Sequence, residues 1–175
     1  FWLRGQVFGM AIHGKADCLL QLAGNELIIV DHKKSGSKAR RARLDAGWDL
    51  QVELYRIMAR TPETDETAPA ARKNLSIANA IGVAYHLMND GGMLLDGVTL
   101  DRSEHFSQMT SDISVNAMAK LEEEVVAVRA GMIRLNGSGD RKKFRNVSVG
   151  DYAFDTSPLI EAFMIPEDAD AGDGP

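Results

Sequence analysis

Two strand-like apolar runs stand near the start of the chain, on either side of a short turn signal. The first spans residues 13–22, the second spans residues 26–33, and Ala23-Gly24-Asn25 separates them. A Gly-Asn pair between two such runs is typical of a β-hairpin. Residues 1–12 mix aromatic, aliphatic and glycine residues, and we expect them to form a preceding strand.

A helical pattern follows the hairpin. Leu50, Leu54 and Ile57 recur at helical spacing, so the pattern predicts a helix over residues 44–60, which Thr61-Pro62 would end. Residues 61–73 are rich in Pro, Thr, Glu and Ala and contain almost no large apolar side chain. We expect them to form a flexible loop.

The second half of the chain predicts strands, then a helix. Residues 77–88 alternate strictly between apolar and other positions, as a strand does, and residues 93–100 favour another strand. Residues 114–134 carry apolar side chains at near-helical spacing. The acidic, glycine-rich residues 166–175 are expected to be disordered. We therefore predict one domain over residues 1–165, followed by a short tail.

Candidate chemistry gathers at the end of the predicted hairpin. Successive side chains of a strand point to opposite faces, so Asp31 and Lys33 share a face and His32 points away. Asp17 comes from the neighbouring strand, which can bring its carboxylate beside that of Asp31. Mg²⁺ is usually held by one or two carboxylates together with a substrate phosphate. Two carboxylates and a lysine here suit a hard cation and a phosphate.

Three motifs in order carry a family resemblance: Gly14-x-x-Asp17, then Asp31-x-Lys33, then Gln51-x-x-x-Tyr55. Together they resemble the PD-(D/E)XK nucleases, and within them the RecB-like branch. The resemblance implies an α/β fold with a mixed central β-sheet flanked by helices, a restriction-endonuclease-like core. It also implies Mg²⁺- or Mn²⁺-dependent hydrolysis of DNA, of the exonuclease type, in recombination, repair, or phage and defence DNA processing.

The resemblance assigns roles to individual residues. Metal binding would fall to Asp17, Asp31 and the backbone carbonyl of His32. Lys33 would position the attacking water, while Gln51 and Tyr55 would steady the substrate end of the site.

RecB-like nucleases usually carry a helix before the first strand, with a further acidic or histidine residue near the metal. No such helix precedes residue 1 here, so we expect a domain cut from a larger protein that lacks its first helix. His13 is the nearby candidate for this extra ligand because it shares strand parity with Asp17. The alternative is a polar residue at a strand edge, which we favour.

A basic segment follows the metal motif. Six lysines and arginines fall within residues 33–43, which contain no acid, and the rest of the chain carries −11 once their charge is removed from the total of −5. A concentrated basic segment in an acidic protein suggests contact with a phosphate backbone. The predicted DNA-binding residues are Lys34, Lys38, Arg40, Arg41 and Arg43. The alternative is a solvated loop and helix start. A second, weaker basic cluster lies at residues 141–145.

Composition limits the function class. The 175 residues are 45% hydrophobic and 26% charged, which is ordinary for a globular domain, and no run of eighteen apolar residues predicts a membrane span. Cys18 is the single cysteine, so neither a disulfide framework nor a four-cysteine iron–sulfur cluster is expected. We expect a cytoplasmic protein whose partners are DNA and a helicase or another domain of the same polypeptide.

Two other functions remain open. The first is a catalytically inactive module with the nuclease fold, which binds DNA within a larger helicase–nuclease assembly and does not need Mg²⁺ to do so. The second is an unrelated small-molecule enzyme, for which the sequence offers no nucleophile–base pair.

Overall fold

A computed structural model describes residues 1–45, 47, 49–60, 69–100, 104–109 and 111–132 of the chain. Backbone contacts divide the chain into one unit from Phe1 to Glu122 and another from Glu123 onward. Both sheets and the candidate site belong to the first unit. Within the described residues, no helix is long and apolar enough to cross a membrane. The predicted basic cluster at 141–145 and the predicted tail at 166–175 lie outside the described residues.

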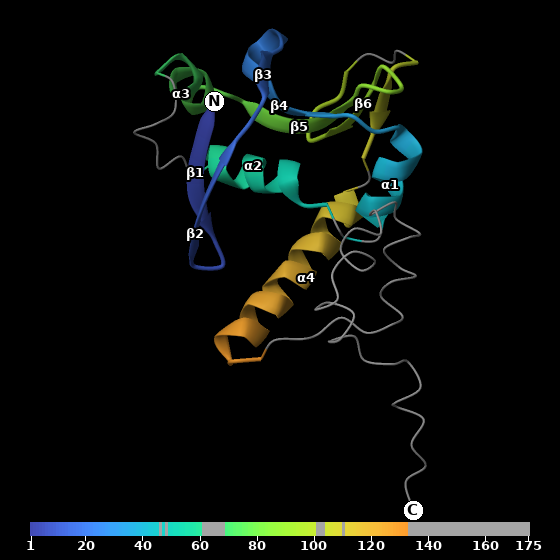
Figure 1. The fold of residues 1–175 in the computed structure, drawn as a ribbon. Helices are drawn as coiled ribbons and strands as arrows, with labels where there is room; N and C mark the ends of the chain where they lie inside the picture. The colour runs from blue at the N-terminus through green and yellow to red at the C-terminus, as the bar shows by residue number, and fades with distance from the viewer. Residues whose placement is uncertain (46, 48, 61–68, 101–103, 110, 133–175) are drawn as a thin grey trace, which may run out of the picture. The chain divides into compact units, whose positions relative to one another are not determined.

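A mixed sheet of five strands, in the order β3-β4-β5-β6-β7, forms the centre of the fold (Figure 1). Its strands are β3 (Cys18–Gln21), β4 (Glu26–Lys33), β5 (Ala80–Leu87), β6 (Gly92–Asp96) and β7 (Phe106–Gln108). The β3–β4 and β5–β6 pairs are antiparallel, whereas β4–β5 and β6–β7 are parallel. The expected α/β fold with a mixed central sheet and flanking helices is therefore confirmed.

The predicted hairpin is present. Cys18 pairs with Val30 and Gln21 pairs with Leu27, and a short 3₁₀ turn (Ala23–Asn25) joins the two strands. Gly24 at φ +71° and Asn25 at φ +59° take the left-handed conformation that this turn requires. Two strands flank the Gly-Asn pair as predicted, because the turn residues tolerate positive φ. The first strand is shorter than the predicted residues 13–22, since β3 begins at Cys18 and residues 13–15 belong to a different strand.

The expected single strand over residues 1–12 was wrong. Two strands form there, β1 (Trp2–Val7) and β2 (Met10–Lys15), and they pair antiparallel in a separate two-stranded sheet. Phe8 at φ +48° and Gly9 at φ +71° make the tight turn between them, a turn type that needs positive φ at both central residues. The apolar continuity of the segment concealed this turn.

The helices also differ from the prediction in their bounds. They are α1 (Ser37–Asp45), α2 (Gln51–Arg60), α3 (Pro69–Ser76) and α4 (Ser111–Arg129). The helix expected over residues 44–60 is two helices, because Gly47 at φ +69° follows α1 and its N–H donates to Leu44 O. Helix α3 lies within the expected loop of residues 61–73 and beyond it, and residues 61–68 of that loop are outside the described part. Strand β7 was not expected from its polar sequence.

One face of the central sheet carries the larger core. Helix α2 packs against β1, β4 and β5 on that face, as Figure 1 shows. Its apolar side chains meet those of the strands there, among them Val52, Tyr55 and Met58 from α2 with Leu27, Ile29 and Tyr85 from the sheet. A smaller core on the other face includes Ile28, Val30 and Ala84. The alternation of β4 thus directs its odd-numbered side chains, and with them Asp31 and Lys33, to the face that α2 covers.

Candidate active site

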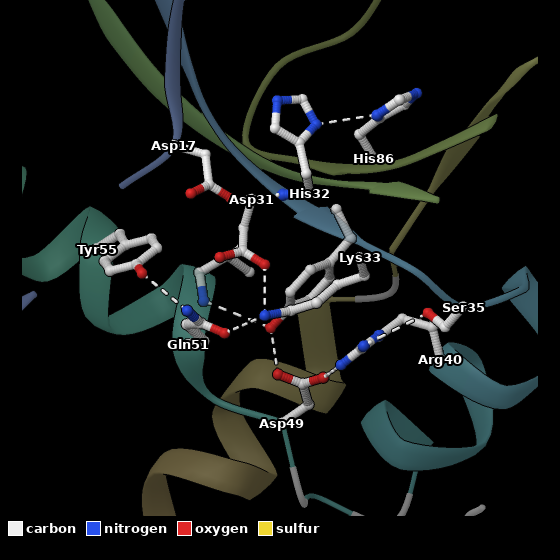
Figure 2. Close-up of polar contacts among 12 residues, drawn as sticks. Asp17, Asp31, His32, Lys33, Ser35, Arg40, Asp49, Gln51, Tyr55 and His86 are labelled. Atoms are coloured by element: carbon white, nitrogen blue, oxygen red, sulfur yellow. Dashed lines mark hydrogen bonds and ion pairs between the residues drawn. The ribbon is translucent and has the colours of Figure 1, made fainter. Parts of the chain in front are cut away.

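Asp31 and Lys33 meet at the carboxyl end of β4, on the face of the sheet that α2 covers. The Lys33 ammonium lies 2.6 Å from Asp31 Oδ2, and their side chains are 25% and 4% exposed, respectively. The expected common face of these two residues is therefore present, and the pair lies at the border between core and solvent (Figure 2).

The Asp31 carboxyl is in an environment that disfavours its charge. Burial raises the pKa of Asp31, the hydrogen bond and charge of Lys33 lower it, and the charges of Asp17 and Asp49 raise it further. Apart from the Lys33 ammonium, the buried Asp31 Oδ2 has no hydrogen-bond donor among the described residues. A second positive charge at this oxygen would offset both the burial and the repulsion.

Asp17 lies beside Asp31 because it directly precedes β3, whose first residue, Cys18, pairs with Val30 of β4. The main-chain N–H of His32 donates to Asp17 Oδ2 at 2.9 Å, so the Asp17 side chain takes the place that a further residue of β3 would occupy. In a strand, the N–H and C=O of one residue point to the same side. The carbonyl of His32 therefore shares the side on which Asp17 lies.

These groups fit a hard divalent cation by their donor chemistry. Two carboxylates, one of them with a buried oxygen short of partners, and one carbonyl are oxygen donors of the kind that Mg²⁺ takes along with water. The described residues contain no cluster of three or more His, Cys, Asp or Glu side chains suited to a metal. Two carboxylates are within the one or two that Mg²⁺ usually takes from a protein.

Helix α2 brings Gln51 and Tyr55 to the same place. The Lys33 ammonium donates to Gln51 Oε1 at 2.5 Å, Gln51 Nε2 donates to the Tyr55 hydroxyl at 2.8 Å, and that hydroxyl donates to Lys15 O at 2.8 Å. The four-residue spacing of Gln51 and Tyr55 places them on one helix face, which this relay uses (Figure 2). Burial raises the pKa of Tyr55, so its hydroxyl stays protonated and can donate.

The glycine of the first motif is explained by packing. A Cβ at Gly14 would lie 2.9 Å from Tyr55 Cε1 and 3.1 Å from Met58 Cε, so a side chain at this position would displace the Tyr55 ring. Gly14 lies in β2, directly across from Leu3 in β1. The first motif therefore supplies a close approach between the β1–β2 hairpin and α2 in addition to Asp17.

The sequence reasoning missed a buried polar cluster next to this site. Asp49 accepts hydrogen bonds from the Tyr85 hydroxyl and from Arg40, and the Arg40 guanidinium lies 4.9 Å from the Tyr85 ring centroid. Tyr85 is the β5 partner of Asp31 in the sheet register, and Asp49 precedes Gln51 by two residues. The position of Asp49 two residues before Gln51 was the sign in the sequence that could have placed it near the site. The cluster ties α1, α2 and β5 together next to Asp31.

The predicted DNA-binding residues separate into two groups. Lys34 and Lys38 are exposed, and Arg41 and Arg43 are half-buried on α1. Arg40 is only 6% exposed and its charge is paired with Asp49, which argues against the predicted contact with a phosphate backbone. The loop before α1 is held by Asp90, whose carboxylate accepts a hydrogen bond from Ser37 N–H, and this bond lowers the pKa of Asp90.

Two other acidic or histidine candidates lie elsewhere. His13 is in β2, in the separate sheet, where its exposed ring is near Trp2, and no contact joins it to Asp17 or Asp31 among the described residues. His13 was expected near Asp17 because both were assigned to one strand. The structure ends β2 at Lys15 and begins β3 at Cys18, so the two residues are not on a common strand. Glu53, an acidic residue of α2 two positions after Gln51, pairs with Arg56 on the same helix.

Comparison with known proteins gives one family. The family model of the PD-(D/E)XK nuclease superfamily matches residues 2–147 of the chain, which includes all three motifs. The match is to the superfamily as a whole and does not distinguish the RecB-like branch. No curated protein and no solved structure matches the chain significantly.

Proposed function

Since the chain belongs to the PD-(D/E)XK nuclease superfamily, we propose that it hydrolyses DNA phosphodiesters with Mg²⁺ or Mn²⁺, as an exonuclease of the RecB-like type. The observation that carries this proposal is the Lys33 ammonium, held between the Asp31 carboxylate at 2.6 Å and Gln51 Oε1 at 2.5 Å. A lysine fixed beside a carboxylate that would hold the metal is suited to act on a water or a phosphate oxygen.

Asp17, Asp31 and the main-chain carbonyl of His32 would hold the ion. When bound, the ion supplies Lewis-acid polarisation of a phosphate oxygen and a lowered pKa for its water. Asp31 is matched to this role because its buried Oδ2 has no partner other than the Lys33 ammonium among the described residues. Asp17 is kept in place by the His32 N–H, which leaves the other oxygen of its carboxylate available for the ion.

Lys33 would orient the attacking water and offset negative charge on the phosphate. An ammonium has three donors, and the contacts with Asp31 and Gln51 account for two of them within the described residues. The third is left for water or a phosphate oxygen. Gln51 holds the ammonium from the α2 side, and Tyr55 holds the Gln51 amide through its hydroxyl. This relay keeps Lys33 from swinging out to solvent.

The DNA backbone would contact the segment that follows β4. Lys34, Lys38, Arg41 and Arg43 are the proposed phosphate contacts, and Arg40 is omitted because its charge is buried and paired with Asp49. The proposal places the activity in recombination, repair, or phage and defence DNA processing in the cytoplasm. A helicase domain of the same polypeptide is the proposed partner.

The test is cleavage of end-labelled linear DNA and of circular DNA, with Mg²⁺, Mn²⁺ or EDTA, for the natural chain and Lys33→Ala. Metal-dependent loss of linear DNA only, absent in the variant, is the expected result. Cutting of circles as well would replace the exonuclease by an endonuclease. DNA binding that needs no metal, with no cleavage under any condition, would contradict the proposal and favour the inactive DNA-binding module.

A further inference from the structure

Two histidines face each other on the side of the sheet opposite Asp31 and Lys33. His32 is on β4, His86 is on β5, and the two residues are direct partners in the parallel register. Figure 2 shows both rings above the strands, whereas Asp31 and Lys33 point below them. Their Nδ1 atoms are 2.9 Å apart, and the ring planes stand at 85° with centroids 5.0 Å apart.

This separation matches what two imidazoles need to share one metal ion. A metal–nitrogen bond of about 2.0–2.1 Å places two ligand nitrogens about 2.9 Å apart at a right angle and about 3.3 Å apart at the tetrahedral angle. The observed distance of 2.9 Å between the two Nδ1 atoms equals the distance expected for a right angle at the metal. A small outward shift of either ring would give the distance expected for a tetrahedral angle. Right-angle nitrogen pairs occur in octahedral and square-planar complexes.

The pair is accessible and is held by the sheet. His32 is exposed and His86 is half-buried, so an ion can reach both rings from solvent. Hydrogen bonding of β4 to β5 along the whole register fixes the distance between the two Cα atoms, so the rings need little ordering to chelate. Met93 lies directly opposite His86 on β6, which puts a thioether sulfur on the same face as a further soft donor.

The geometry points to a second metal site, in which Nδ1 of His32 and Nδ1 of His86 chelate a transition-metal ion of the Ni²⁺, Cu²⁺ or Zn²⁺ class. A hydrogen bond between the two Nδ1 atoms requires a ring proton on one of them. To bind the ion, that proton moves to the Nε2 of the same ring through solvent, so that both Nδ1 lone pairs can face the ion. Water fills the remaining coordination positions.

This site is distinct from the proposed nuclease site in its chemistry. Imidazole nitrogen suits Ni²⁺, Cu²⁺ and Zn²⁺, whereas Mg²⁺ takes oxygen ligands. His32 would take part in both sites. Its main chain lies beside Asp17 at the proposed nuclease site, and its ring would bind the second ion on the opposite face of the sheet.

The experiment is Ni²⁺ binding by calorimetry to the untagged full chain carrying Asp31→Asn, which removes the carboxylate site and with it any dependence on the nuclease proposal. In this background, His86→Gln and His32→Gln should each weaken Ni²⁺ binding by at least about tenfold, the lower end of what loss of even an outer-shell partner costs. His13→Gln and His105→Gln alter the other two histidines and should bind as the background does.

A second measurement covers the case in which a variant folds poorly. Ni²⁺ should raise the melting temperature of the background and of His105→Gln, because it binds the folded chain, and should not raise that of His86→Gln. Excess Mg²⁺ should leave Ni²⁺ binding unchanged. Equal Ni²⁺ affinity in His86→Gln and its background, or displacement of Ni²⁺ by Mg²⁺, would overturn the proposal.

Discussion

The Lys33 ammonium lies 2.5 Å from Gln51 Oε1, which joins the last residue of β4 to the first residue of α2. Lys33 also contacts Asp31 at 2.6 Å, and Gln51 continues to Tyr55 and the Lys15 carbonyl. The second and third motifs are therefore one hydrogen-bonded unit, and the unit ends on Lys15 of the β1–β2 hairpin, next to Gly14 of the first motif.

Lys33→Met should reduce DNA cleavage by about 10²–10³-fold, the range observed when one preorganised donor to a transition state is removed. The variant should remain folded because the Lys33 side chain is one-quarter exposed and a methionine can occupy the same space. The measurement is single-turnover cleavage of labelled linear DNA with saturating enzyme and Mg²⁺.

The matched control is Lys34→Met, which removes the same charge one residue later, from an exposed side chain. It should weaken DNA binding and leave the cleavage rate of bound DNA nearly unchanged. The same loss of single-turnover rate in both variants would mean that Lys33 contributes only to DNA binding.

Asp31→Asn should stabilise the metal-free fold at neutral pH. Because burial raises the pKa of Asp31, the folded chain holds this proton to a higher pH than the unfolded chain does. The protonated carboxyl therefore favours folding at low pH, and this contribution is lost as the pH rises through the raised pKa. In EDTA, thermal melts should show a higher melting temperature for the variant at pH 7, with the difference shrinking on acidification. A difference that grows toward low pH would contradict this account.

Mg²⁺ should reverse that order of stability. An ion that binds only the folded chain raises its melting temperature with ion concentration, and Asp31 supplies the buried oxygen for it. The natural chain should melt at higher temperature as Mg²⁺ is added, and Asp31→Asn should not respond. Asp45→Asn, which alters an exposed aspartate of α1, is the control and should respond as the natural chain does. A full Mg²⁺ response in Asp31→Asn would exclude Asp31 as a ligand.

Arg40→Met and Arg41→Met should change different properties, although the two arginines are neighbours: the first should lower stability, and the second should weaken DNA binding. Removing Arg40 leaves the buried Asp49 carboxylate without its positively charged partner, which should cost about 3–5 kcal/mol of unfolding free energy. Arg41→Met should change stability by less than about 0.5 kcal/mol. It should instead weaken DNA binding and lower the salt dependence of binding by about one unit of slope.

Urea unfolding and DNA titrations at several salt concentrations check both halves of this prediction. Loss of DNA affinity without loss of stability in Arg40→Met would show that Arg40 leaves Asp49 to bind DNA, contrary to its place in the structure.

Gly14→Ala should act through Tyr55. The added Cβ would lie 2.9 Å from the Tyr55 ring, so the ring must shift, and we expect this shift to disturb the hydrogen bonds of its hydroxyl with Gln51 and Lys15. Overpacking of this kind typically costs about 1–3 kcal/mol, and the cleavage rate should fall as well. Tyr55→Phe removes the hydroxyl and leaves the ring. The cleavage rates of the two single variants and the double variant form a cycle, and additive effects would separate Gly14 from the relay.

The parts of the site that the sequence predicts depend on local patterns. Asp31 and Lys33 share a face because strands alternate, and Gln51 and Tyr55 share a face because helices repeat near four residues. The Gly-Asn turn predicts the β3–β4 hairpin for the same reason, since the turn residues themselves prefer its backbone conformation.

The parts that the sequence does not predict depend on partners distant along the chain. Arg40 looks like a surface charge in a basic run, and only the approach of Asp49 and Tyr85 makes its burial possible. Gly47 is one glycine in a helical pattern, yet its positive φ separates α1 from α2 and so brings Asp49 beside Arg40. Phe8 adopts a positive φ that sequence preference disfavours, so the β1–β2 turn was missed.

Strand β4 is paired on both sides, antiparallel to β3 and parallel to β5, and its two faces carry different chemistry. Because its side chains alternate between the two faces, a shift of the strand by one residue moves every side chain to the opposite face. Insertion or deletion of one residue within it would exchange the acid–lysine pair for the histidine and send apolar side chains to the wrong core. Insertion or deletion of two residues would keep each side chain on its face and would only move the site along the strand. Within this strand, insertions and deletions of an even number of residues are therefore the tolerated ones, while the turns at its ends can vary in length.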